Sequence, residues 1–261
     1  MTSKKMELIG NGGHWAVSRI TTTENGISKS IVFKKPLKNQ KPDNNISNYR
    51  LIFSCNLPTL SKFSKTTING IEGIEAEDLN PKNCDGFYVS PNTIRNSENC
   101  ASIIIKYLKN SKETLPGDCK EFNVSEYIKH PEKIEEDIDK LIEKRILKGA
   151  EKYVYENKIN TISNFNNFLI KSKADMKKAS DNQIELFSDA FFFRVSQSTK
   201  GIEYKIADFD CIISHKKSKT SHQNLLNGNL SYFETALTEF IEFFVEKNHK
   251  ETYITEIKNV W

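Results

Sequence analysis

The sequence predicts an α+β protein of two lobes: an N-terminal antiparallel β-sheet lobe with one helix and a mainly helical C-terminal lobe with an embedded β-hairpin. Three observations predict this class. Strand-like alternation dominates the first 79 residues, helical periodicity dominates from Pro131, and one pair of short alternating runs interrupts the helical half. We therefore expect a β-rich lobe over 1–79, an irregular insertion over 80–122 and a helical lobe over 123–261.

Composition narrows the classes of function. The 261 residues carry a net charge of +4, and lysine alternates with acidic residues, as in 131–140, which is typical of a solvated helix face. No apolar run reaches the ~18 residues of a membrane span, and the first residues lack a secretory signal. The five cysteines and five histidines show no zinc-ligand spacing. We expect a cytoplasmic protein with no membrane partner.

The N-terminal lobe is predicted to begin with a hairpin. Asn25-Gly26 separates two alternating runs, and this dipeptide favours a tight turn between antiparallel strands. Residues 45–56 show helical spacing and end before Pro58. Further strand-like runs cover 59–63, 66–68 and 70–77.

The C-terminal lobe is predicted to contain three helices and a hairpin. An apolar stripe from Ile134 to Val154 follows Pro131, and a second helix spans 163–178. Two alternating runs, Phe191–Val195 and Glu203–Ala207, predict a hairpin across Gly201. A capping box at Ser231–Glu234 predicts the start of the last helix.

Glycines near the N-terminus form the first candidate site. Gly10, Gly12 and Gly13 lie between two strands, with Val17 beyond them. Glycine lets backbone amides approach phosphate oxygens that a Cβ would obstruct. A glycine-rich hairpin turn is the plain structural alternative.

Two further segments carry charges that suit phosphate chemistry. Lys34 ends an apolar strand, where it would bind phosphate oxygens or remain an exposed lysine. Asp208-Phe209-Asp210 ends another apolar strand, and carboxylates at such a place suit Mg2+ that is also bound by substrate phosphates.

The glycine loop, the strand lysine and the late Asp-Phe-Asp, in this order, resemble the protein-kinase-like superfamily, as an atypical and divergent member. The resemblance extends over about residues 6 to 213. It implies ATP bound between the lobes, Lys34 on its phosphates, and Mg2+ on Asp208 and Asp189. Residues 75–79 resemble the hinge segment, which implies that Glu75 and Glu77 lie near the nucleotide.

The sequence also departs from the pattern of that superfamily. Trp15 stands where a third glycine would fall, and the helix at 45–56 has no glutamate to pair with Lys34. The His-Arg-Asp motif is not visible. Asp189 suits the second metal ligand by its place before Phe191–Phe193, and suits the catalytic aspartate by its distance from Asp208. In the first case Asp181 or Glu185 would have to act as base.

The expected function is therefore an ATP- and Mg2+-dependent phosphotransferase, an atypical kinase with Lys34, Asp189 and Asp208 in catalytic roles. The acceptor is open and would be a protein or a small molecule. The transferred group is also open, because a nucleotidyl group could be transferred instead of a phosphoryl group. The alternative is a catalytically inactive pseudokinase that binds nucleotide or protein, with 80–122 as the partner surface. A third hypothesis is a basic module that binds nucleic acid, against which the alternating charge argues.

Overall fold

The computed structural model describes residues 2–11, 14–37, 41–82, 84–90, 159–218 and 220–261. Its N-terminal part is a five-stranded sheet made of β1 (Thr2–Asn11), β2 (Trp15–Glu24), β3 (Ile27–Pro36), β4 (Phe63–Ile68) and β5 (Ile71–Glu77). All neighbouring strands are antiparallel, and their order is β1-β2-β3-β5-β4. The α+β class with an antiparallel N-terminal sheet is confirmed.

Two Asn-Gly turns set the strand register of this sheet. Asn25 and Gly26 have φ values of 51° and 79° and join β2 to β3. Asn69 and Gly70, with φ values of 52° and 76°, join β4 to β5 in the same way. Two consecutive positive φ angles define the hairpin turn that matches the twist of the flanking strands. The hairpin predicted at Asn25-Gly26 is confirmed.

The helix of the N-terminal part is α1 (Pro42–Ser54), which begins three residues before the predicted start. Pro42 occupies the first turn, where a missing N–H costs nothing. The strand predicted over 59–63 is wrong except for Phe63, which begins β4. Thr59 instead forms an isolated parallel bridge with Ile206, and its hydroxyl donates a hydrogen bond to the Ile206 carbonyl at 2.8 Å.

The C-terminal part contains the predicted second helix and the predicted hairpin. These are α6 (Phe165–Asp181), and β7 (Phe191–Val195) paired with β8 (Ile202–Ile206). A second pair of short strands joins β6 (Ile184–Leu186) to β9 (Ile212–Ser214). The helix predicted from Pro131 lies outside the described residues, and the division of the chain at 79/80 and 122/123 stays a prediction.

The prediction for the last helix is wrong at its start. α7 (His222–Phe244) begins nine residues before the capping box, and Ser231 lies within it. A separate helix, α8 (Lys247–Val260), follows. Asn229 of α7 is fully buried, and its amide bonds to the Leu186 N–H and the Ile184 carbonyl, each at 2.8 Å. These contacts to β6 fix the first turns of α7 from outside the helix.

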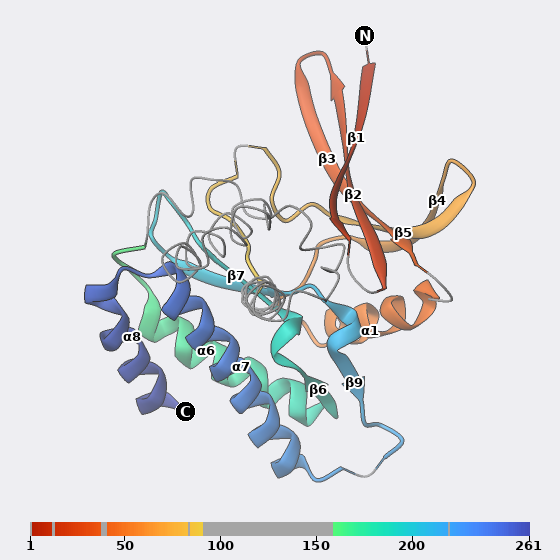
Figure 1. The fold of residues 1–261 in the computed structure, drawn as a ribbon. Helices are drawn as coiled ribbons and strands as arrows, with labels where there is room; N and C mark the ends of the chain where they lie inside the picture. The colour runs from red at the N-terminus through yellow and green to blue at the C-terminus, as the bar shows by residue number, and fades with distance from the viewer. Residues whose placement is uncertain (1, 12–13, 38–40, 83, 91–158, 219) are drawn as a thin grey trace, which may run out of the picture.

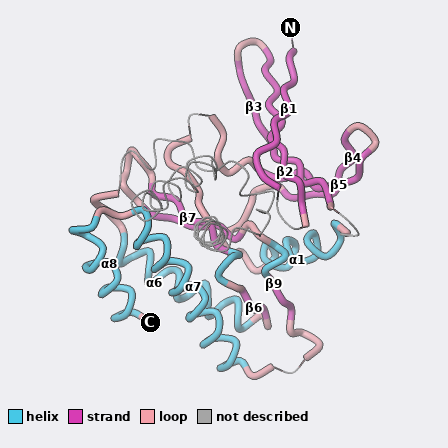
Figure 2. The backbone as a smooth tube through the Cα atoms, viewed as in Figure 1, coloured by secondary structure: helices cyan, strands magenta, loops and turns pink. Residues whose placement is uncertain are grey.

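Figure 1 shows the sheet on one side of the molecule and α6, α7 and α8 on the other, with α1 next to β9. Figure 2 shows the strands β1 to β3 extending away from the helices. One hydrophobic core nevertheless runs through both parts, from Ile74 of β5 and Ile52 of α1 to Phe191 and Phe233. None of the described helices combines the length and apolarity needed to cross a membrane.

Candidate nucleotide and metal site

The β7–β8 hairpin brings two of the predicted site carboxylates to one end. Its last pair is Phe191 opposite Ile206, and the Ala207 N–H donates to the Ala190 carbonyl at 3.0 Å. The next residues outward on the two sides are Asp189 and Asp208. They lie in or beside two short 3-10 turns, η2 (Ser188–Ala190) and η3 (Phe209–Cys211).

Lys34 of β3 approaches the same point. Burial raises the pKa of the Asp208 carboxyl, the Lys34 ammonium lowers it, and Asp210 and Asp189 raise it again, so that it lies above its ordinary value. The neighbouring Cys211 thiol has its pKa raised to about 12 by burial and by the same three carboxylates, while Lys34 acts in the opposite direction. Three acidic groups and one lysine therefore act on each other within a small, partly buried volume.

Helix α1 positions the Asp-Phe-Asp segment without a carboxylate. The Asn48 side-chain amide donates to the Phe209 carbonyl at 2.9 Å and to the Ile212 carbonyl at 3.1 Å. The Phe209 ring lies between Tyr49 and Phe63, with centroid distances of 5.5 and 4.5 Å. An amide and two rings thus anchor the backbone on either side of Asp210.

The acidic residue of α1, Asp43, lies 3.5 Å from Lys65 and not at Lys34. Lys34 places its ammonium 5.8 Å from the centre of the Phe63 ring. The sequence has no glutamate in α1 that could pair with Lys34. In the structure, an amide and aromatic rings occupy this side of the site instead.

Trp15 connects the sheet directly to the acidic segment. Its Nε1–H donates to Asp210 Oδ2 at 2.7 Å, and the Asp210 N–H in turn donates to Asp208 Oδ1 at 3.3 Å. The Trp15 side chain is buried, with 6% exposure. The residue in the place of the third glycine thus bonds across the site, a contact that the sequence did not reveal.

The structure describes only part of the predicted glycine loop. Gly10 lies in β1, opposite Val17 of β2, and Val17 lies opposite Lys34 of β3. Gly12 and Gly13 lie outside the described residues. Gly10, Val17 and Lys34 therefore lie side by side on three adjacent strands, with Gly10 on the edge strand β1 and Lys34 on β3.

The glutamates predicted at the hinge are bound to lysines. Glu75 pairs with Lys62, and Glu77 pairs with Lys205 of β8 at 2.6 Å. Glu77 also accepts hydrogen bonds from the Ser61 N–H and hydroxyl at 2.6 and 3.0 Å. Burial would raise the pKa of Glu77, but these bonds outweigh it and lower the pKa. Glu77 therefore ties the sheet to the hairpin that carries Asp208.

The segment after β5 is held by groups that sequence reasoning missed. The Arg19 guanidinium bonds to the buried Asp78 carboxylate, with 2.7 Å between Nε and Oδ2, and also to the Asn80 carbonyl. The Asn80 amide bonds in turn to the backbone of Tyr88 at 2.8 and 3.0 Å. These contacts of Arg19 could not be predicted from the sequence, because its two partners lie 59 and 61 residues away along the chain.

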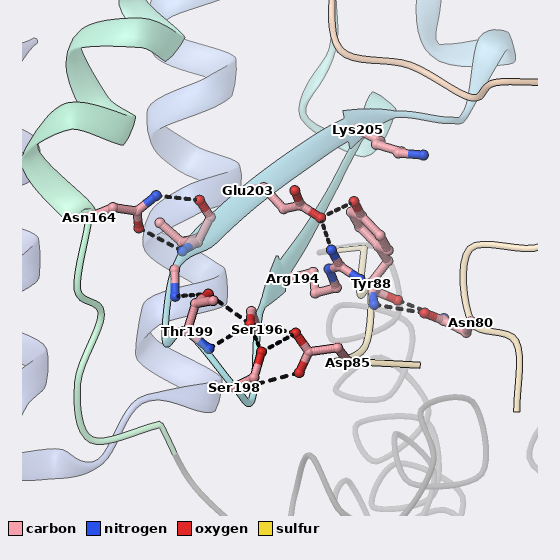
Figure 3. A network of polar contacts seen from close by, with 12 residues as sticks. Asn80, Asp85, Tyr88, Asn164, Arg194, Ser196, Ser198, Thr199, Glu203 and Lys205 are labelled. Atoms are coloured by element: carbon pink, nitrogen blue, oxygen red, sulfur yellow. Dashed lines mark hydrogen bonds and ion pairs between the residues drawn. The ribbon is translucent and has the colours of Figure 1, made fainter. Parts of the chain in front are cut away.

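Residues 84–90 lie along the edge of β7, and Figure 3 shows Asp85 and Tyr88 of this segment beside the hairpin. Val89 and Phe193 exchange two backbone hydrogen bonds, of 2.8 and 2.9 Å. Tyr88 donates its hydroxyl to Glu203. The Ser196 and Ser198 hydroxyls and a backbone N–H bond to Asp85 and lower its pKa to about 2. The first part of the predicted insertion is thus an added strand-like segment of the hairpin.

The three candidate bases are separated by the structure. The Asp181 carboxylate bonds to His222 Nε2 at 2.6 Å, and the Glu185 carboxylate bonds to His215 Nε2 at 2.8 Å. The charges with the largest effects on the Asp208 carboxyl include Asp189 and neither of these two. Asp189 is therefore the candidate that the fold brings to the site.

The donors at the site suit one class of metal. Within the described part of the chain, no group of three or more His, Cys, Asp or Glu side chains could hold a metal ion. Asp189 and Asp208 offer hard oxygen donors, and Mg2+ is commonly bound by one or two carboxylates together with substrate phosphates and water. Burial, and then repulsion by Asp210 and Asp189, raise the pKa of Asp208, and a divalent cation would offset both effects. The residues fit Mg2+ bound together with a phosphate ligand.

No protein-family model matches this sequence, and no curated protein matches it. Among solved structures, the chain is similar to that of the gentamicin–APH(2")-IIa complex, with 12% sequence identity over 97% of this chain and 80% of that chain. The TM-score is 0.26. A TM-score this low does not establish a common fold, so the function is inferred from the site alone.

Proposed function

We propose that the protein is an ATP- and Mg2+-dependent phosphotransferase, an atypical kinase with its nucleotide between the sheet and the β7–β8 hairpin. The observation that carries the proposal is the convergence of Lys34 of β3 with Asp189 and Asp208, which lie on the two sides of one end of the β7–β8 hairpin. Both Lys34 and Asp189 act electrostatically on the Asp208 carboxyl. Cation and carboxylates at one point are what a phosphate ligand with a divalent metal requires.

Each group would have a distinct role. Lys34 would hold phosphate oxygens as a point charge, and Asp208 and Asp189 would hold Mg2+, which when bound neutralises phosphate charge. Since Glu75 and Glu77 are bound to lysines, the backbone of this segment, and not its carboxylates, would meet the adenine. Asp189 would otherwise take the proton of the acceptor hydroxyl, and the acceptor would be a protein or a small molecule.

The first test is a thermal-unfolding scan with and without ATP and Mg2+, with EDTA as a control for the metal. A ligand at 100 times its Kd adds about 2.7 kcal/mol to the free energy of unfolding. We expect such a metal-dependent rise in the wild type and its loss in Lys34→Met. Lys35→Met is the matched control, because Lys35 is exposed and its side chain alternates to the other face of β3. A wild type that ATP and Mg2+ leave unshifted would contradict the proposal.

The hydrogen bond of Trp15 favours the second candidate function, a catalytically inactive module. It joins β2 to the segment that would face the phosphates, so nucleotide would have to break it or bind beside it. In this alternative, the insertion predicted over 80–122 serves protein binding, and ATP produces no turnover even where it binds.

Trp15→Phe is expected to lower the free energy of unfolding by about 1.5–3 kcal/mol, because it removes a hydrogen bond to a carboxylate while it keeps one aromatic ring in place. Urea denaturation measures the change. Trp261→Phe is a matched control, since the buried Trp261 Nε1 has no hydrogen-bond partner among the described residues. Equal losses in the two variants would show that the Trp15 bond adds no stability of its own.

A further inference from the structure

The outer strand of the sheet, β1, exposes both of its faces. The described residues Ser3 to Ile9 are all exposed, and within the described part of the chain only β2 pairs with this strand. Met6 and Leu8 are 51% and 63% exposed and lie on one face, and the ion-paired Lys5 and Glu7 lie on the other. A long edge strand without proline is a template for another strand, provided that its charged side chains meet opposite charges on that strand.

The sequence of β1 is complementary to itself in one antiparallel register. Along an antiparallel pair of strands, opposed residues alternate between hydrogen-bonded and non-hydrogen-bonded pairs. A two-fold axis preserves this alternation only where a residue lies opposite the same residue of the second copy, so the axis must pass through such a pair. An axis at Met6 places Lys5 opposite Glu7 of the second copy on both sides, and Lys4 opposite Leu8. Met6 then faces Met6, with Leu8 as its diagonal neighbour.

Registers with the axis at residue 4, 5, 7 or 8 are less favourable. An axis at Lys4, Lys5 or Glu7 opposes like charges at the centre of the pair, which is destabilising. An axis at Leu8 leaves Lys5 and Glu7 without opposite charges across the pair and runs into the bulge between Leu8 and Gly10. The Met6 register keeps its central pairs, residues 4 to 8, clear of that bulge.

We propose that two copies of this chain associate through antiparallel pairing of their β1 strands about a two-fold axis at Met6, with two intermolecular Lys5–Glu7 ion pairs. The result is one sheet that continues across both copies, as in other cases of strand addition at a sheet edge. The proposal does not depend on nucleotide binding, because it uses only the edge of the sheet opposite to β4.

Charge exchange tests the register by sedimentation velocity. Wild type is expected to dimerise, whereas Lys5→Glu and Glu7→Lys are each expected to sediment as monomers, because like charges then oppose each other. An equimolar mixture of the two variants is expected to form heterodimers, in which every pair is again opposite in charge. Lys29→Glu, an exposed change on β3, is the matched control and should leave the dimer intact.

A second test does not require the charge variants. Met6→Cys places a thiol opposite its own copy, and mild oxidation should join the two chains through that disulfide. Leu8→Cys faces Lys4 and should not cross-link, and the wild type controls for the native cysteines. A monomeric wild type, a mixture that stays monomeric while circular dichroism shows folded protein, or cross-linking of Leu8→Cys in preference to Met6→Cys would overturn the proposal.

Discussion

Asp208→Asn is expected to abolish the stabilisation of the protein by ATP and Mg2+ while raising the unfolding temperature of the unligated protein. The carboxylate is costly in the absence of a ligand, because it is buried and two further carboxylates repel it. An asparagine removes that charge, and its side-chain oxygen can still accept from the Asp210 N–H. The same substitution also removes the negative charge that would hold Mg2+. A site that trades stability for function behaves in this way.

The measurement is a pair of thermal scans for each protein, one without ligand and one with ATP and Mg2+. The unligated gain is expected within the range of about 0.5–2 kcal/mol that single stabilising substitutions give, which is a few degrees for a chain of this size. Retention of the full nucleotide-dependent shift by Asp208→Asn would contradict the metal role, whatever its effect on stability.

Glu77→Gln is the comparison with the opposite expected sign. Its pKa is lowered in the folded protein, chiefly because Lys205 and Ser61 outweigh the effect of burial. Such a carboxylate stabilises the fold at neutral pH, and its contribution is lost as the pH falls through the lowered pKa. Glu77→Gln should therefore lower the unfolding temperature at neutral pH, and the nucleotide-dependent shift should remain.

Features specified by a few neighbouring residues could be predicted from the sequence. Asn25-Gly26 dictates a turn through its backbone conformation alone, and the alternation of Phe191–Val195 and Glu203–Ala207 specifies a hairpin. The convergence of Lys34 with Asp208 was inferred from the order of short motifs, and the structure brings the two groups within electrostatic range.

Features that depend on distant partners could not be predicted. The capping-box pattern at 231–234 predicts a helix start by itself, but α7 begins nine residues earlier, where buried contacts of Asn229 to β6 hold its first turns. The bond from Trp15 to Asp210 spans 195 positions in the sequence. The residue types alone do not indicate this pairing, because a tryptophan N–H can donate to many acceptors and an aspartate can accept from many donors.

Phe233→Ala is expected to cause the largest loss of stability of any single change discussed, about 3–5 kcal/mol. The ring is fully buried on α7 and contacts aromatic rings from other parts of the fold, with centroid distances of 5.0 Å to Phe191, 5.1 Å to Tyr204 and 5.5 Å to Trp261. Alanine would leave a cavity where the hairpin carrying Asp208 rests on the helices. Phe53→Ala is the matched control, because its ring is 55% exposed, and it should cost less than about 1 kcal/mol. Urea denaturation compares the two, and equal losses would show that this aromatic cluster does not anchor the site.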